Sequence, residues 1–261
     1  MGVLDTFALR GKVALVTGGA GLYGRQIVRA LAEAGAETYA ASRNLDNLNQ
    51  LRAELNNAQL DVTPLQFDQG HEASALALRD NVLGKSGRID VLVNNAVLRP
   101  MKQGYQDGAE TFDESMRVNA TGLFAVTRAF GDAMSSRGSG SIINIGSIQG
   151  MVGPDPTIYE GTAMSGWYPD YFFHKGGMIN FTRFVASYYG AHGVRCNCIC
   201  PGGYETPNHP PAFVRNYSAR TFLGRMANDT DLMGAVVFLA GDASAYVTGA
   251  TLPVDGGYTA K

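Results

Sequence analysis

The residues best suited to proton transfer lie between the motifs NIGSIQG and YFFHK, where three tyrosines occur in one short stretch. Tyr159 and Tyr168 have an alanine and a phenylalanine four positions later, whereas Tyr171 has Lys175. Side chains at this spacing are neighbours on one face of a helix. A phenol has a pKa near 10, and lowering it by ~3 units takes about 4 kcal/mol, which a nearby ammonium can supply. The spacing therefore makes Tyr171 the one candidate acid or base among the three, although on spacing alone a surface Tyr–Lys pair of no consequence is the commoner explanation.

Residues 17–24, TGGAGLYG, form a glycine-rich turn between a strand-like run and a helix-like segment. Glycines allow a tight turn, and they let backbone N–H groups approach a pyrophosphate at the positive end of the helix. Glycines also simply end strands, but the strand–turn–helix context that a dinucleotide site requires is present here. The turn therefore predicts a dinucleotide cofactor.

The expected second strand ends with Ser42, Arg43 and Asn44, and no Asp or Glu occurs from 38 to 45. Sites that prefer NAD usually place a carboxylate here, on the adenine ribose hydroxyls. A guanidinium instead pairs with a 2′-phosphate, which a carboxylate would repel. The pattern favours NADP(H), and NAD(H) is the alternative if Arg43 is only a solvated surface charge.

Short apolar runs alternate with helix-period segments along the chain. The strand-like runs are 13–17, 38–41, 64–67, 90–96, 141–146, 194–200 and 251–254, and the helix-period segments are 25–35, 44–57, 72–83, 111–136, 171–190 and 231–240. Such alternation is typical of a parallel sheet whose crossover helices cover both faces. We expect one doubly wound, Rossmann-like α/β domain over residues 1–261, with a seven-stranded, mainly parallel sheet.

Composition argues against several other classes of protein. Apolar residues make up 45% and charged residues 17% of the 261 residues, as in globular chains. The formal net charge of −2 gives no basic footprint for nucleic acid or an anionic membrane. No apolar run approaches the ~20 residues that span a bilayer, and the N-terminus lacks the order of a signal peptide. We therefore expect a cytoplasmic protein.

The three cysteines lie together in RCNCICPG. Cys196, Cys198 and Cys200 share one face if this segment is a strand, and a straight strand cannot bring three thiolates to one metal ion. They are expected to be small buried hydrophobic side chains, and we expect no metal site.

The chain resembles the short-chain dehydrogenases/reductases (SDRs) of the single-domain, Rossmann-fold type over nearly its whole length. The matching motifs occur in the family's order: TGGAGLYG, NNA at 94–96, VNATG at 118–122, NIGSIQG at 144–150, YFFHK at 171–175, PGGYET at 201–206 and VDGG at 254–257. Each motif is weak alone, whereas seven in register are highly specific. The resemblance implies an enzyme that transfers a hydride between a nicotinamide cofactor and an alcohol or carbonyl.

The resemblance implies four catalytic residues in this chain. Tyr171 would be the general acid/base, and Ser147 would hydrogen-bond the same substrate oxygen. Lys175 would lower the pKa of Tyr171 and bind the nicotinamide ribose, and Asn119 would hold a water that links Lys175 to solvent protons.

The resemblance also implies a set of residues around the cofactor, from the phosphate turn to the nicotinamide. These are Gly18, Leu22, Tyr23, Gly24, Ser42, Arg43, Asn44, Asp68, Gln69, Asn95, Ala96, Tyr171, Lys175, Pro201, Gly202 and Thr206. Two positions depart from the family pattern, because Leu22 replaces the middle glycine of the turn and Val97 replaces the glycine after NNA. Neither change removes a reacting group, so we expect adjusted binding with activity retained.

Two variable segments are expected to surround the substrate. Ser147 and Tyr171 are farther apart in sequence than in most family members, so residues 148–170 must loop out, and residues 203–224 occupy the position of the family's mobile lid. The candidate substrate-binding residues are Ser147, Tyr159, Trp167, Tyr204 and His209. Aromatic and hydrogen-bonding groups together suit a sugar or polyol, and an inert loop or a subunit contact is an equal alternative for 148–170. Arg215 and Arg220 in the lid permit an acidic substrate, although surface arginines are common.

We expect an NADP(H)-dependent oxidoreductase acting on a small polar substrate, a sugar, polyol or sugar derivative. A ketoacyl or hydroxysteroid reductase is the first alternative, and a dinucleotide-binding regulator without catalysis is the second. The four catalytic residues argue against the regulator, which has no need of them. By resemblance, a homotetramer or dimer is expected.

Overall fold

The protein is described here by a computed structural model that covers residues 2–260. Seven strands form one sheet in the order β3-β2-β1-β4-β5-β6-β7, and every adjacent pair is parallel. Their bounds are β1 Val13–Thr17, β2 Glu37–Ser42, β3 Val62–Gln66, β4 Val91–Asn94, β5 Gly140–Ile145, β6 Val194–Pro201 and β7 Thr251–Val254. The predicted strands are all present, with ends shifted by a few residues, and the expected doubly wound fold is confirmed.

The helices lie between the strands along the chain. Their bounds are α1 Leu22–Glu33, α2 Leu45–Asn56, α3 Glu72–Ser86, α4 Ala109–Met116, α5 Leu123–Arg137, α6 Pro169–Gly190, α7 Pro211–Ser218 and α8 Met233–Ala240. Short 3-10 helices span η1 Val3–Phe7, η2 Gly104–Gln106, η4 Ile148–Gly150, η5 Pro156–Tyr159 and η6 Asp242–Ser244. Among residues 2–260, no helix is both long enough and apolar enough to cross a membrane.

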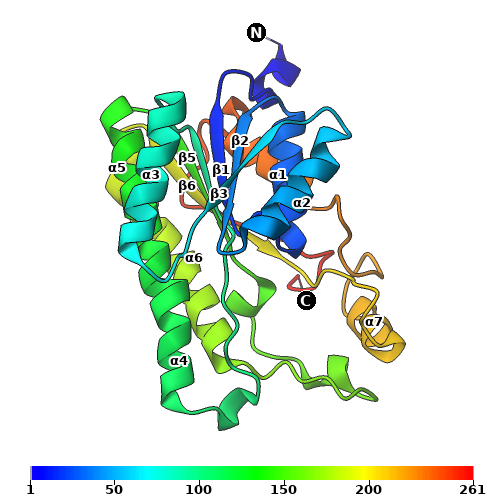
Figure 1. The fold of residues 1–261 in the computed structure, drawn as a ribbon. Helices are drawn as coiled ribbons and strands as arrows, with labels where there is room; N and C mark the ends of the chain where they lie inside the picture. The colour runs from blue at the N-terminus through cyan, green and yellow to red at the C-terminus, as the bar shows by residue number, and fades with distance from the viewer. Residues whose placement is uncertain (1, 261) are drawn as a thin grey trace.

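Helices cover both faces of the sheet, with α3, α5 and α6 on one side and α1 and α2 on the other (Figure 1). The alternation of side chains along β1 explains the two layers. Ala14 and Val16 pack in a buried cluster with residues of α1, α2 and α8. Val13 and Leu15 pack in a second cluster with residues of α3, α5 and α6. The sheet is therefore apolar on both faces, and polar ligands can approach only its edges and ends.

The segment predicted as one helix over 111–136 is interrupted. A π-helical stretch, η3 Arg117–Gly122, separates α4 from α5. The backbone of Gln69 lies so close that a Cβ on Gly122 would come within 2.0 Å of its carbonyl oxygen. Gln69 Nε2 also donates to the carbonyl of Val118 at 3.0 Å. The wider turn frees main-chain groups for these contacts and directs Asn119 toward the backbone of Leu98.

Candidate active site

Tyr171 and Lys175 lie on the first turns of α6, where a parallel sheet presents the carboxyl ends of its strands. Pro169 occupies the start of this helix, where its fixed φ and missing N–H are tolerated. Lys175 is buried, and its Nζ donates to the carbonyl oxygen of Ile145 at the end of β5. This Nζ lies 5.7 Å from the centre of the Tyr171 ring. Helix spacing and the strand end together hold the ammonium beside the phenol.

The surroundings of Tyr171 lower its pKa below the usual value of 10.0. Burial alone raises the pKa, because it disfavours the phenolate. The positive charges of Lys175 and Arg99 and a hydrogen bond from Ser147 outweigh burial and favour the phenolate. For Lys175 burial is the larger effect and lowers the pKa of the ammonium, although the nearby Tyr171 acts to raise it. This charge pattern suits a phenol that gives up its proton more readily than an ordinary tyrosine, as a general acid/base requires.

Ser147 follows β5 and begins the 3-10 helix η4. Its Oγ accepts a hydrogen bond from the N–H of Gln149 at 3.1 Å, which fixes the hydroxyl in place. The side chain is mostly buried but reaches the large cavity together with Tyr171. The structure therefore brings the seryl and phenolic hydroxyls together despite the intervening loop.

Arg99 is the residue beside Tyr171 that the sequence analysis missed. Its guanidinium carbon lies 4.4 Å from the centre of the Tyr171 ring, and its positive charge helps to lower the pKa of the tyrosine. Arg99 is exposed and lines the large cavity. The only available signal was its place shortly after β4, because residues that follow parallel strands gather at one end of the sheet.

Asn119 does not line the cavity but holds one of its walls. Its Oδ1 accepts from the N–H of Leu98 at 2.8 Å, and its Nδ2 donates to the Leu98 carbonyl at 2.7 Å. Nδ2 also donates to Ser115 Oγ at 3.0 Å, and Ser115 in turn donates to the buried carboxylate of Asp170 at 2.5 Å. A series of buried hydrogen bonds thus connects Asp170, which precedes Tyr171, with Leu98, which precedes Arg99.

The glycine-rich turn fits a dinucleotide phosphate. A Cβ on Gly18, whose φ is +65°, would lie 2.8 Å from the Cα of Ala96. A Cβ on Gly24 would lie 2.1 Å from the carbonyl oxygen of Gly18, so α1 packs directly on the turn. Asn95 Nδ2 donates to the carbonyls of Thr17 and Gly18 at 3.1 and 2.9 Å. The turn is held rigid with its backbone accessible, as a pyrophosphate site requires.

Leu22 replaces a glycine of the family pattern at the start of α1. Its side chain is 61% exposed and lines the cavity, so it does not fill the space between the turn and the helix. Tyr23, the next residue, donates its hydroxyl to the carbonyl of Gly202 at 2.7 Å. Its ring also meets Tyr204 edge-on, with ring centres 5.4 Å apart. These contacts join the phosphate turn to the loop after β6.

The far end of the cavity carries the residues predicted at the adenosine. Ser42 Oγ donates to the carbonyl of Asn44 at 3.0 Å, and the Asn44 side chain caps α2 by accepting from Asn47 N at 3.0 Å. Arg43 is exposed, and no ion pair joins it to a carboxylate of residues 2–260. Asp68 accepts from the N–H of Gly70 at 2.9 Å. The guanidinium of Arg43 is thus available to bind a phosphate on the adenosine ribose.

The loop 148–170 and the lid 203–224 pack against each other beside the cavity. The rings of Tyr159 and Phe213 stack with centres 5.5 Å apart. Arg220 Nε lies 3.0 Å from Asp155 Oδ2, and Asn216 donates to the carbonyl of Glu160 at 2.9 Å. In Figure 1 the loop and α7 both extend from the end of the sheet. The loop 148–170 and the lid therefore form one continuous wall beside the cavity.

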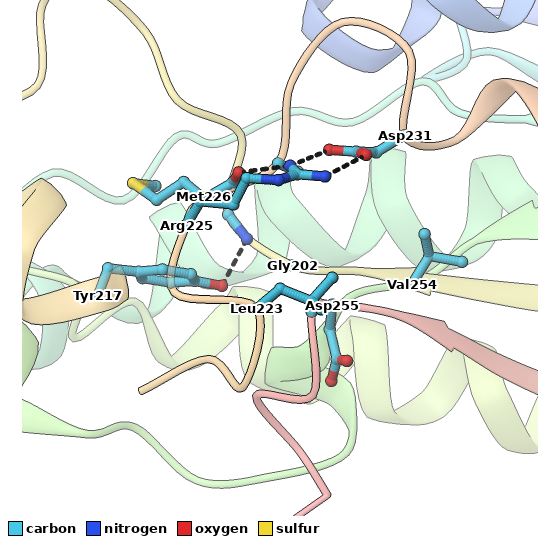
Figure 2. A pocket seen from close by; sticks show the side chains of 11 residues that line it. Gly202, Tyr217, Leu223, Arg225, Met226, Asp231, Val254 and Asp255 are labelled. Atoms are coloured by element: carbon cyan, nitrogen blue, oxygen red, sulfur yellow. Dashed lines mark hydrogen bonds and ion pairs between the residues drawn. The ribbon is translucent and has the colours of Figure 1, made fainter. Parts of the chain in front are cut away.

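A smaller cavity of about 80 Å³ lies at the base of the lid, as Figure 2 shows. Tyr217 accepts a hydrogen bond from the N–H of Gly203. Arg225 forms a two-pronged ion pair with Asp231, at 2.6 and 2.8 Å. Both contacts are dashed in the figure; the first ties the start of the lid to α7, and the second fixes the chain just after the lid.

Most residues predicted for the site line one cavity of about 830 Å³. They are Gly18, Leu22, Tyr23, Ser42, Arg43, Asn44, Asp68, Gln69, Asn95, Ala96, Ser147, Tyr159, Tyr171, Lys175, Pro201, Gly202, Tyr204 and His209. Gly24, Asn119, Thr206 and Trp167 do not line it. Thr206 instead donates its N–H to His209 Nδ1 at 3.3 Å, and the exposed Trp167 packs its carbonyl against Gly104. Volume and lining both fit a dinucleotide with a small substrate.

The three cysteines are buried in β6, and the Sγ atoms of Cys198 and Cys200 lie 3.8 Å apart. Within residues 2–260, no group of His, Cys, Asp or Glu side chains is arranged to hold a metal ion.

Comparison with known proteins supports this architecture. A family profile described as enoyl-(acyl carrier protein) reductase matches residues 21–259. The chain is 32% identical to galactitol 2-dehydrogenase (L-tagatose-forming) of Cereibacter sphaeroides, over 97% of each chain. It is 32% identical to D-threitol dehydrogenase of Mycolicibacterium smegmatis, over 98% of this chain and 95% of the other.

A solved structure extends the comparison to three dimensions. Gluconate 5-dehydrogenase from Burkholderia cenocepacia, in complex with NADP and tartrate, superposes with a TM-score of 0.88 at 32% identity, over 100% of both chains. The chain belongs to the short-chain dehydrogenase/reductase family. It is an NAD(P)-dependent oxidoreductase that acts on CH–OH groups and the corresponding carbonyls.

Proposed function

We propose that this enzyme interconverts an alcohol and a carbonyl on a sugar, a polyol or a related small polar molecule, with NADP(H) as the favoured cofactor. One observation carries the proposal. Tyr171, with its pKa lowered, lies between Lys175 and Ser147 in a cavity that also contains the glycine-rich phosphate turn. Proton transfer and cofactor binding therefore take place in one space.

In the oxidation direction, Tyr171 accepts the proton of the substrate hydroxyl, and in reduction it returns that proton to the carbonyl oxygen. Ser147 hydrogen-bonds the same oxygen and holds it where negative charge develops. Lys175 stabilises the phenolate from the adjacent helical turn. Asn119 holds the chain at Leu98 and keeps the wall of the site in position. A nicotinamide cofactor held in this cavity would supply the hydride chemistry, and Tyr171, Ser147 and Lys175 handle the substrate oxygen and its proton.

The preference for NADP(H) is supported by Arg43. Its guanidinium is exposed, lines the cavity and has no carboxylate partner among residues 2–260. A ribose 2′-phosphate would pair with it, and no carboxylate on the β2 end opposes that charge. The gluconate 5-dehydrogenase structure holds NADP, which agrees with this assignment.

The class of substrate is supported by the rim of the cavity and by the relatives. Gln149, Tyr159, Tyr168 and His209 line the wall with aromatic planes and hydrogen-bonding groups, which suit the C–H faces and hydroxyls of a sugar or polyol. Several relatives are named as polyol or sugar-acid dehydrogenases, alongside others named for cyclic alcohols, a hydroxysteroid or an oxoacyl substrate. We further infer a cytoplasmic enzyme.

Assembly into a homodimer or tetramer is part of the same proposal. Phe173, Phe184 and Tyr188 on α6 are 67%, 60% and 62% exposed, and Phe184 stacks on Tyr188 at 5.9 Å. Several exposed aromatic rings on one helix are typical of a surface that a partner covers. Helix α6 also carries Tyr171 and Lys175, so such contacts would steady the catalytic helix.

The function is tested by following nicotinamide absorbance with a panel of polyols, sugars, sugar acids and bulky apolar ketones, each with NADP and NAD. We expect turnover with polar substrates and a higher kcat/KM with NADP. Tyr171→Phe should lower kcat by about 100-fold or more, while NADP binding, measured by fluorescence titration, is retained. Tyr168→Phe is the matched control and should stay within about tenfold of the parent.

Three results would contradict the proposal. Faster turnover of ketoacyl or steroid ketones than of any polar substrate would select the alternative reductase. Binding of NADP without turnover of any substrate would favour a regulator. Equal losses in Tyr168→Phe and Tyr171→Phe would remove the assignment of the proton to Tyr171.

A further inference from the structure

We propose that Arg99 binds a carboxylate of the substrate, so that the preferred substrates are hydroxy acids with the carboxylate one or two carbons from the reacting carbon. The inference rests on the proposed function, because it concerns the same site at Tyr171. It narrows the substrate from polar molecules in general to anionic ones.

The position of Arg99 is the first observation. Its guanidinium carbon is 4.4 Å from the centre of the Tyr171 ring, and its side chain is exposed to the cavity. A substrate oxygen bound by Tyr171 and Ser147 must therefore lie close to this guanidinium. The group next to the reacting carbon would meet a planar cation with five N–H donors.

The positive charge of Arg99 has no carboxylate partner in the described part of the protein. Among residues 2–260, no carboxylate forms an ion pair with it. Asp155, which lines the same cavity, is engaged by Arg220 at 3.0 Å and by the hydroxyl of Thr157 at 2.6 Å. Asp68 lies at the adenosine end, where it accepts from Gly70 N–H. A neutral polyol would leave the Arg99 charge unpaired, whereas a carboxylate would pair with both prongs of the guanidinium.

The backbone next to Arg99 is held in advance of binding. Asn119 bonds both the N–H and the C=O of Leu98, at 2.8 and 2.7 Å. The same carboxamide is tied to Ser115 and through it to the buried Asp170. A guanidinium on a fixed backbone loses less conformational entropy when it binds an anion. The polar chain thus prepares the anion site and the tyrosine together.

The lid arginines do not provide this site. Arg220 is paired with Asp155, and neither it nor Arg215 lines the cavity. Lys175 lines the cavity, but it is buried and donates to the carbonyl of Ile145. Of the cations that line the cavity, Arg99 is therefore the one placed for a substrate carboxylate, since Arg43 lies at the ribose end.

The experiment compares matched substrates of equal chain length, such as erythritol with erythronate and xylitol with xylonate, using the purified enzyme and NADP. The measured quantity is the ratio of kcat/KM for the acid to that for the polyol. In the parent we expect a ratio of about tenfold or more. Arg99→Gln should lower the acid value by about 10- to 100-fold, the range of a lost charged hydrogen-bonding pair. Any effect of Arg99 on Tyr171 itself changes kcat/KM for both substrates by the same factor and therefore cancels in the ratio.

Two further variants sharpen the comparison. Arg99→Lys keeps the positive charge but lacks the two-pronged guanidinium. Its ratio of kcat/KM for the acid to that for the polyol should therefore fall between those of the parent and Arg99→Gln. Arg215→Gln removes an exposed lid arginine outside the cavity and should keep the parent's ratio. Malonate, which carries no alcohol, should bind the NADP-loaded parent in calorimetry and should bind Arg99→Gln at least about tenfold more weakly.

The outcomes separate this inference from the proposed function. Turnover of polyols with no acid preference, or a ratio unchanged in Arg99→Gln, would overturn the carboxylate site and leave the oxidoreductase assignment standing. Absence of turnover with every polar substrate would overturn the proposed function, and malonate binding would then still decide the role of Arg99. Equal malonate affinity in the parent and Arg99→Gln would overturn the site.

Discussion

The carboxamide of Asn119 holds both backbone polar groups of Leu98, accepting from its N–H at 2.8 Å and donating to its C=O at 2.7 Å. The two residues lie 21 positions apart, and the contact joins the π-helical stretch to the loop after β4. This loop carries Arg99, and the π-helical stretch leads back through Ser115 to Asp170 on α6. The wall of the active site and the catalytic helix are thus one connected unit.

Replacing Asn119 by alanine should weaken both the fold and the activity. The substitution leaves buried partners without their hydrogen bonds, and each such loss costs about 1–3 kcal/mol. We expect the free energy of unfolding, measured in urea, to fall by at least that amount, and kcat to fall as Arg99 and Tyr171 lose their relative position. Asn57→Ala, at an exposed position after α2, should change the unfolding free energy by less than about 0.5 kcal/mol. Equal stability of Asn119→Ala and the parent would refute the role of this clamp.

Removing the ammonium beside Tyr171 should move the pH dependence of alcohol oxidation. The reaction needs the phenolate, so its rate rises as pH passes through the pKa of Tyr171, which the protein lowers. In Lys175→Met the phenolate loses the cation with the larger effect on its pKa, and the pKa of Tyr171 should rise by about one unit or more. The rising part of the rate profile should shift to higher pH by the same amount. Lys175→Arg keeps the charge and should recover part of the shift; an unmoved profile in Lys175→Met would contradict the charge argument.

Arg43 should determine the choice between the two cofactors. Its exposed guanidinium is placed for the 2′-phosphate that distinguishes NADP from NAD. Arg43→Ala should lower kcat/KM for NADP by about 10- to 100-fold, because a charged hydrogen-bonding pair is lost, and should change the value for NAD by less than about threefold. Arg52→Ala, an exposed arginine of α2 outside the cavity, serves as the control. An equal fall in kcat/KM with NADP and with NAD would show that Arg43 does not bind the 2′-phosphate.

The sequence predicted those features that depend on local spacing. Tyr171 and Lys175 were identified because i and i+4 positions meet on any helix, whatever surrounds it. The strands followed from short apolar runs, and the observed sheet uses all of them. The glycine of the phosphate turn followed from its place between strand and helix, and the clash around Gly18 shows why no other residue fits.

The features that were missed depend on contacts between distant segments. Arg99 faces Tyr171 because Asn119 fixes the backbone before it, and no local pattern indicates that pairing. The π-helical stretch arises where α4 and α5 meet Gln69 and Gly70, whereas the apolar periodicity alone indicated a continuous helix. Helix α7 begins at Pro211 in the lid, and its buried Phe213 and Tyr217 lie four positions apart on one face, a short pattern that the sequence analysis did not use. Its order comes from packing on residues 156–159.

A buried histidine should make the protein less stable in mild acid. His174 is 4% exposed, neither ring nitrogen has a hydrogen-bond partner among residues 2–260, and it meets Tyr171 edge-on at 5.1 Å. Burial, with the charges of Lys175 and Arg99, lowers the pKa of His174 to about 3, below the usual 6.5. Between these values the unfolded chain binds a proton that the folded chain does not, so lowering the pH favours unfolding.

The contribution of His174 can be isolated by measuring urea unfolding of the parent and His174→Leu between pH 7.5 and 4.5. The stabilising effect of the neutral ring is present in full above pH 6.5. Below that pH the parent should lose up to about 1.4 kcal/mol per pH unit from this one group. The slope should be smaller by that amount in His174→Leu and unchanged in His192→Gln, which alters an exposed histidine. If the parent and His174→Leu lose stability at the same rate, His174 is not the group that titrates on unfolding.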